Sequence, residues 1–165
     1  MSAEKKKQAG VLGLIIALVI VLISSLLFVG AVSGWFDDSR LSLDPEYICQ
    51  QECDGELQDL TGKEYEDLIS KKKSFIVFID QGGCTTADRL REYVSSYARD
   101  HKIKVYRMMF EVEKETSLHN YVEYYPSVVM VSKGKVVGFL RADSDEDAPI
   151  YNDYNEFQNW IRRFL

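Results

Sequence analysis

Residues that commonly bind metals are scarce in this sequence, which contains three cysteines and two histidines among 165 residues. Cys49 and Cys53 lie four positions apart, but two thiols are too few for a zinc site. The two histidines, His101 and His119, have no ligand-like spacing to these cysteines. We therefore expect no metal site and no cofactor.

Charged residues are absent between Val11 and Val32, a run built almost entirely of aliphatic and small residues. A helix of this length would extend about 33 Å at 1.5 Å per residue. The hydrocarbon core of a bilayer is about 30 Å thick. Residues 11–33 are therefore predicted to form one transmembrane helix, with the lipid bilayer as its partner.

A cleaved signal peptide is the alternative interpretation of this apolar run. The small residues of the stretch 29–34 suit a signal peptidase. However, the apolar region of a signal peptide usually has about 7–15 residues, so the longer run favours a retained anchor. No cysteine directly follows the run, which argues against a lipoprotein-type anchor.

The charges that flank the apolar run indicate its orientation. Lys5, Lys6 and Lys7 precede it, whereas Asp37 and Asp38 follow it. Because lysines and arginines favour the cytoplasmic side, residues 1–10 are predicted to be a basic cytoplasmic N-terminus. The chain is then a single-pass protein of the cell membrane, with its domain in the periplasm, outside the cell or in an organelle lumen.

Basic residues are outnumbered by acidic ones in the rest of the chain. From residue 8 onward the sequence keeps 25 acidic and 17 basic residues, a net charge of −8. Such a domain is repelled by polyanions, so we expect neither nucleic acid nor anionic lipid as a partner.

Residues 34–60 are polar and acidic and are predicted to be a tether that carries Cys49 and Cys53. On a helix this spacing would put both thiols on one face, close enough for a disulfide. The expected compartment is oxidising. Three arrangements remain open: Cys49 bonded to Cys53, Cys84 bonded to one of them, or all three reduced.

Residues 61–165 show alternating helix and strand patterns. Thr61 and Glu64 have the spacing of a capping box, and Ser74–Ile79 is a continuous apolar run typical of a strand buried on both faces. The predicted elements are helices 62–71, 84–99, 116–122 and 154–164, and strands 74–79, 104–110, 127–132 and 135–140. This order predicts an α/β fold, a mixed sheet with helices on both faces.

The order resembles the thioredoxin-like superfamily over residues 61–165. Cys84 opens a helix directly after the first central strand, as the nucleophilic cysteine of that family does. Tyr125-Pro126 precedes the next central strand, where the family has its cis-proline. The hairpin at 127–140 and the last helix also match. The resemblance implies that Gly83, Thr85, Tyr125 and Pro126 contact a polypeptide substrate beside Cys84.

Several residues depart from the family pattern. Ala87 stands where the Cys-x-x-Cys motif has its second cysteine, and Gly83 stands where the family has a tryptophan. Phe78 falls near the position of the buried acid, and Tyr125 is bulkier than the usual residue before the proline. The motif is thus a degenerate Cys-x-x-Ala, which lacks a resolving thiol.

Cys84 is the candidate nucleophile, because the N-terminus of a helix favours a thiolate. We expect Arg89 and Arg91 to support the thiolate and Asp80 and Asp88 to oppose it. His119 is expected to be a surface residue.

The tyrosines at 121, 124 and 125 lie near the proline, and the loop 142–153 with Tyr151 and Tyr154 is a candidate partner contact. Two functions remain open. One is thiol–disulfide exchange on exported polypeptides through Cys84; the other is a redox-inactive binding module in a membrane protein complex.

Overall fold

The computed structural model describes Val19, residues 41–49 and residues 54–165. The chain divides into two units, Met1–Asp38 and Ser39–Leu165. Apart from Val19, the predicted transmembrane segment 11–33 lies outside the described residues, as does the basic segment 1–10. No helix within the described part of the chain is both long and apolar enough to cross a bilayer.

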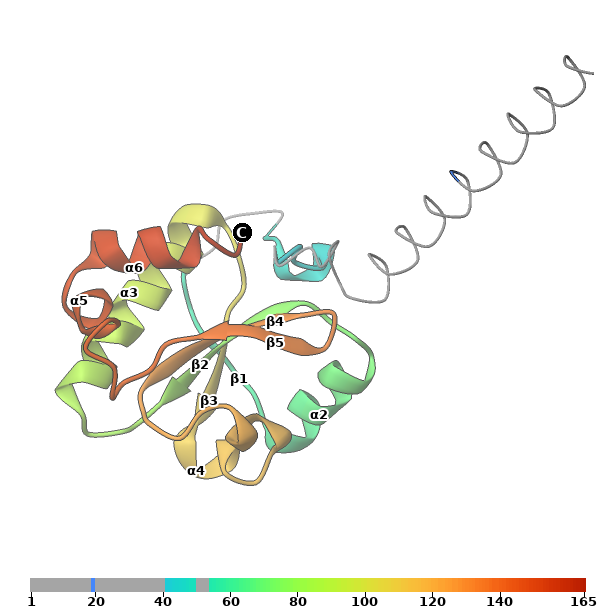
Figure 1. Ribbon diagram of the computed structural model, residues 1–165, viewed down its shortest axis with the longest axis horizontal. Coiled ribbons are helices and arrows are strands. Elements are labelled where there is room, and N and C mark those ends of the chain that lie inside the picture. The colour runs from blue at the N-terminus through green and yellow to red at the C-terminus, as the bar shows by residue number, and fades with distance from the viewer. Residues whose placement is uncertain (1–18, 20–40, 50–53) are drawn as a thin grey trace, which may run out of the picture. The chain divides into compact units, whose positions relative to one another are not determined.

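The second unit is built on a five-stranded sheet with the order β1-β3-β2-β4-β5 (Figure 1). β2 runs parallel to β3, and β3 runs parallel to β1, whereas β4 is antiparallel to both β2 and β5. The strands are β1 (Gln58–Asp59), β2 (Phe75–Asp80), β3 (Tyr106–Met109), β4 (Ser127–Ser132) and β5 (Lys135–Phe139). The predicted mixed sheet is confirmed.

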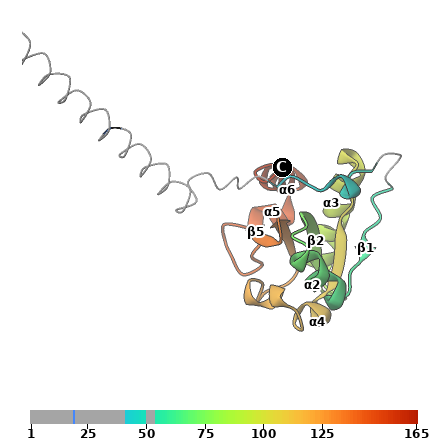
Figure 2. The same ribbon diagram turned by 90° about the vertical axis from the view of Figure 1, so that its right-hand side faces the viewer.

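Helices cover both faces of this sheet, with α3, α5 and α6 on one side and α2 and α4 on the other (Figures 1 and 2). The predicted capping box at the start of α2 is present. The helices are η1 (Pro45–Tyr47), α2 (Gly62–Ser70), α3 (Thr85–His101), α4 (Phe110–Glu113), η2 (Ser117–Asn120), α5 (Ala148–Asn152) and α6 (Tyr154–Ile161), where η denotes a 3-10 helix.

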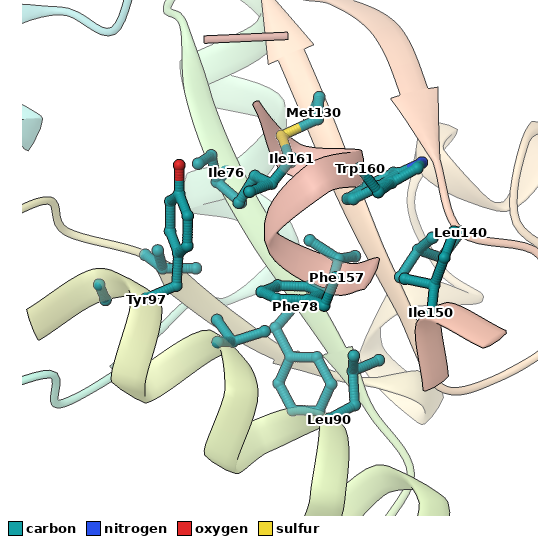
Figure 3. Close-up of a cluster of buried hydrophobic side chains, with 14 of the residues drawn as sticks. Ile76, Phe78, Leu90, Tyr97, Met130, Leu140, Ile150, Phe157, Trp160 and Ile161 are labelled. Atoms are coloured by element: carbon teal, nitrogen blue, oxygen red, sulfur yellow. The ribbon is translucent and has the colours of Figure 1, made fainter. Parts of the chain in front are cut away.

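The central strands bury side chains on both faces, because successive residues of a strand point to opposite sides. Ile76 and Phe78 of β2 belong to the cluster under α3, α5 and α6, whereas Phe75, Val77 and Ile79 belong to the cluster on the α2 side. Figure 3 shows Phe78 next to Leu90 of α3 and Phe157 of α6, in the same hydrophobic cluster. Phe78 therefore fills its position as an apolar core residue.

The described part of the predicted tether packs onto the domain. Leu41 and Tyr47 are 4% and 3% exposed. The Tyr47 ring contacts Phe75 and Tyr106 at centroid distances of 6.3 and 5.7 Å, and β1 pairs with β3. The packed unit therefore begins well before residue 61, because these aromatic contacts and backbone bonds bind the segment to the sheet.

Candidate functional site

Three segments meet at the sheet edge where β2 and β3 end and β4 begins. Ile79 of β2 pairs with Ser127 of β4, so Pro126 enters β4 beside Asp80, the last residue of β2. Cys84 follows this strand end after a short turn. The topology thus brings Cys84 and Pro126, 42 residues apart in the sequence, to one edge.

Cys84 is a free cysteine and is partly exposed. It is the N-cap residue of α3, a helix of 17 residues, and its carbonyl accepts the amide N–H of Asp88 at 3.0 Å. The positive end of the helix dipole and the free N–H groups of the first turn favour an anion at this position. The arrangement can support thiolate chemistry.

The neighbours of Cys84 explain part of the departure from the family pattern. Gly83 has a φ of +75°, a conformation that L side chains rarely adopt, and no heavy atom lies within 4 Å of a Cβ placed there. The backbone conformation therefore favours glycine, although space is open for a side chain. Gly83 and Thr85 are both exposed. Ala87 is fully buried one helical turn after Cys84.

The arginines near Cys84 are occupied by other partners. Arg91 donates to both carboxylate oxygens of Asp80, at 2.8 and 3.0 Å, and to Asp88 at 2.8 Å. The hydrogen bond to Asp80 raises the pKa of Arg91. Arg89 donates to the side-chain oxygen of Asn152 in α5 at 2.5 Å. The Arg91 charge therefore neutralises the buried Asp80 and fixes the end of β2 to α3.

The peptide bond Tyr125–Pro126 is cis, as the sequence predicts. Tyr151 of α5 donates its hydroxyl to the carbonyl of Pro126 at 2.8 Å, and the Ser127 hydroxyl donates to the carbonyl of Leu140 at 2.7 Å. Tyr151 is 5% exposed. Tyr151 is thus part of the core and supports the proline loop, so its expected role as a surface contact is wrong.

A buried acid lies directly behind the proline loop. Glu113, at the end of α4, is 0% exposed, and its Oε2 accepts the hydroxyl of Tyr125 at 2.6 Å. Nδ1 of His119 lies 3.5 Å from this Oε2 and from the Tyr125 hydroxyl. Burial raises the pKa of Glu113, and the hydrogen bond from Tyr125 opposes this increase. Glu113 cannot be singled out in the sequence, because it lies between two other glutamates, Glu111 and Glu115.

Tyr121 and Tyr124 lie beside the same loop and are 50% and 53% exposed. They line a hollow of about 150 Å³ together with Phe139 and Arg141. Tyr125 is only partly exposed. Tyr154 packs on Tyr93 and Phe157. Of the predicted tyrosine contacts, Tyr121 and Tyr124 are therefore the most available to a partner.

Among the predicted disulfide residues, Cys49 is disulfide-bonded, whereas Cys84 is free. Cys53 lies outside the described residues, so the pairing Cys49–Cys53 stays a prediction. Within the described residues, no group of three or more His, Cys, Asp or Glu side chains is placed to hold a metal ion.

The structure is similar to solved thioredoxins. A mutant thioredoxin from Halobacterium salinarum is 17% identical, with a TM-score of 0.50 over 69% of this chain and 95% of that one. Fasciola hepatica thioredoxin is also 17% identical, with a TM-score of 0.51 over 66% and 100%. Trypanosoma brucei brucei thioredoxin is 11% identical, with a TM-score of 0.50 over 70% and 99%. These likenesses establish a thioredoxin-like fold.

No family model matches the chain, and no curated protein matches it either.

Proposed function

We propose that the chain is a membrane-tethered, extracytoplasmic thioredoxin-like protein that exchanges thiols and disulfides with exported polypeptides through Cys84. The observation that carries this proposal is the position of Cys84. It is a free, partly exposed cysteine at the start of a long helix, on the sheet edge where a cis-proline opens β4. Thioredoxin-like folds support thiol–disulfide chemistry at this edge.

The reaction begins when the Cys84 thiolate attacks one sulfur of a substrate disulfide. A new Cys84–substrate disulfide forms, the substrate S–S bond breaks, and the second substrate sulfur leaves as a thiolate that takes a proton from water. Ala87 cannot supply a second thiol. Release of Cys84 therefore needs another thiol, either a small one of the glutathione class or a cysteine of a second protein.

The polypeptide substrate would lie along the edge formed by Gly83, Thr85 and the Tyr125–Pro126 peptide. Gly83 and Thr85 are exposed next to Cys84. A glycine permits close approach of another backbone. These residues would place the substrate sulfur, whereas Cys84 carries out the chemistry.

The sequence supports both the proposed membrane anchor and the proposed location of the domain on the non-cytoplasmic side. The uncharged run Val11–Val32 has the length of a bilayer span, and Lys5–Lys7 lie on its N-terminal side. A disulfide at Cys49 suits an oxidising compartment. We therefore propose a cytoplasmic segment 1–10, an anchor at 11–33 and an extracytoplasmic domain.

A redox-inactive binding module within a membrane protein complex is the second candidate function. Ala87 removes the resolving thiol, and the half-exposed rings of Tyr121 and Tyr124 suit a protein contact. In this case Cys84 would have no redox role, and Tyr121 and Tyr124 would bind the partner.

A disulfide-reduction assay with added small thiol distinguishes the two functions. Wild type should form a mixed disulfide but turn over slowly, and Cys84→Ser should form none. Ala87→Cys should raise turnover by about a hundredfold or more, because an intramolecular thiol has a very high effective concentration. Ala87→Ser, which changes the same buried position without adding a thiol, is the control.

The thiol-exchange proposal would fail if Cys84 resisted alkylation and Ala87→Cys, correctly folded, stayed inert. The binding module would then be the better explanation.

A further inference from the structure

Burial of the Glu113 carboxyl group, behind the proline loop of the candidate site, is unfavourable for folding. Its carboxyl group is fully buried, and one of its oxygens, Oε1, has no hydrogen-bond partner among the described residues. A buried polar atom without a partner is unfavourable for folding. Neighbouring Glu111 is exposed on the same short helix, so within α4 the burial of an acid is specific to position 113.

Four ionisable groups from four segments surround this carboxyl. Tyr125 donates to it from the loop before β4, and His119 of η2 lies 3.5 Å away. Burial raises the pKa of Glu113, and the charge of Lys114, next to it on the chain, is one of the effects that oppose this increase. Burial raises the pKa of Tyr65 in α2, and the negative charge of Glu113 adds to this increase. The 2.6 Å bond from Tyr125 is the shortest of these contacts and is a strong hydrogen bond when Glu113 is ionised.

The side chain of Tyr125 is held by α4 and η2. Its ring lies 5.4 Å from the ring of Phe110, and the ammonium group of Lys114 lies 5.9 Å from its centroid. Its hydroxyl binds Glu113. Tyr125 also forms the cis peptide with Pro126 at the edge that carries Cys84. The carboxyl of Glu113 therefore fixes the ring that borders the proposed substrate edge.

We propose that Glu113 is a positioning residue: its carboxyl holds the Tyr125 ring on α4 and so keeps the edge between Cys84 and Pro126 open to a polypeptide. This inference rests on the proposed thiol exchange at Cys84. Without the hydrogen bond, the bulky ring of Tyr125 would turn over the edge and obstruct a polypeptide backbone. A small disulfide that needs only Cys84 would still react.

The test compares two probes with the same leaving group on the full chain in detergent micelles. One is a small aromatic disulfide that releases nitrothiobenzoate, and the other is an extended peptide whose single cysteine carries nitrothiobenzoate in a disulfide. The measured quantity is the ratio of the peptide rate to the small-probe rate. Ionisation of Cys84 cancels in this ratio, because the same thiolate attacks both probes.

Glu113→Leu and Tyr125→Phe should each lower the ratio by roughly tenfold, the equilibrium effect of one hydrogen bond of about 1.4 kcal/mol. Glu113→Gln keeps a neutral acceptor oxygen and should stay near the wild-type ratio measured at low pH, where Glu113 is protonated. Glu111→Gln, on the exposed side of α4, is the matched control and should not change the ratio. A folded Glu113→Leu with the wild-type ratio would overturn the proposal, and Tyr125→Phe provides the same test if Glu113→Leu does not fold.

A pH profile separates positioning from simple structural support. The wild-type ratio should rise with pH as Glu113 ionises, because a carboxylate accepts the Tyr125 hydrogen bond more strongly than a carboxylic acid does. The ratio should be flat in Glu113→Gln. His119→Gln tests whether the imidazole causes the change, and loss of the pH dependence in that variant with its retention in Glu113→Gln would contradict the role of Glu113.

The experiment distinguishes failure of the proposed thiol exchange from failure of the positioning role of Glu113. If Cys84 reacts with neither probe, the thiol exchange is wrong, and the position of Tyr125 is then read from its ring resonances in a sample with isotope-labelled tyrosine. These resonances should shift with pH in wild type and not in Glu113→Gln. Identical behaviour of the two proteins would overturn the positioning role as well.

Discussion

At the scale of single residues, Glu113 shows how burial sets the properties of a side chain. Its carboxyl is 0% exposed, and desolvation raises its pKa above the ordinary value of 4.5. An unfolded chain releases this proton near the ordinary value, whereas the folded chain keeps it to higher pH. Folding is therefore linked to proton uptake at this residue.

We predict that Glu113→Gln alters how stability depends on pH. The contribution of Glu113 to wild-type stability is fully present below pH 4.5 and is lost as the pH rises through the raised folded-state pKa. Glutamine does not titrate, so the stability of the variant relative to wild type should increase over this window and then level off. Thermal unfolding of both proteins at a series of pH values measures this difference.

Glu111→Gln is the control for this measurement, because Glu111 is exposed and should leave the pH dependence unchanged. Parallel stability curves for wild type and Glu113→Gln would show that burial does not perturb Glu113.

At the scale of elements, α5 supports the proline loop from a distance of 25 residues in the sequence. Tyr151 of α5 donates to the Pro126 carbonyl, and Asn152 accepts from Arg89 of α3. The short helix therefore links the helix that carries Cys84 to the loop that carries Pro126. This link gives the segment after β5 a structural role in the candidate site.

Tyr151→Phe should lower the free energy of unfolding by about 1–3 kcal/mol, because it leaves the buried Pro126 carbonyl without its donor. Chemical denaturation of wild type and Tyr151→Phe measures this decrease in the free energy of unfolding. Tyr154→Phe is the matched control, since the Tyr154 hydroxyl makes a long, exposed contact of 3.5 Å to Asp100 and interacts with the side chain of Gln158, so neither partner is a buried backbone group. Equal stability of the two variants would contradict a role for Tyr151 in holding the loop.

The elements also show what the sequence can predict. The sequence predicts β2 and β4 because strands buried on both faces are built largely of apolar residues. β1 has two exposed residues, Gln58 and Asp59, and its pairing with β3 comes from tertiary contacts rather than from a hydrophobic pattern. α5 was missed because its five residues include a proline and are too few for helical periodicity.

The candidate site likewise contains residues that the sequence predicts and interactions that it does not. Cys84 and Pro126 could be predicted because Cys84 follows the central strand β2 and Pro126 directly precedes the central strand β4. The bonds of Glu113 to Tyr125 and of Arg91 to Asp80 could not, because each depends on how a helix packs on the sheet. In sequence, Glu113 looks like Glu111 and Glu115, its exposed neighbours.

At the scale of the whole molecule, the two ends of the chain differ in charge: the segment before the apolar run is basic, and the chain after it is acidic. Three lysines precede the apolar run, whereas the chain from residue 8 onward has a net charge of −8. Lysines resist transfer across the membrane more effectively than acidic residues do. We expect the disulfide at Cys49 to form on the non-cytoplasmic side, because disulfides persist in oxidising compartments.

We predict that a membrane-impermeant protease added to intact cells or spheroplasts removes the domain, because we expect the Lys5–Lys7 cluster to keep the N-terminus in the cytoplasm. Immunoblotting with an epitope at each end of the chain detects the result: the N-terminal epitope should survive on a short fragment, and the C-terminal epitope should disappear. Replacing all three lysines with glutamate should weaken this orientation and protect part of the population. A domain that survives on intact cells and on spheroplasts and is cut only after lysis would contradict a location in the periplasm or outside the cell.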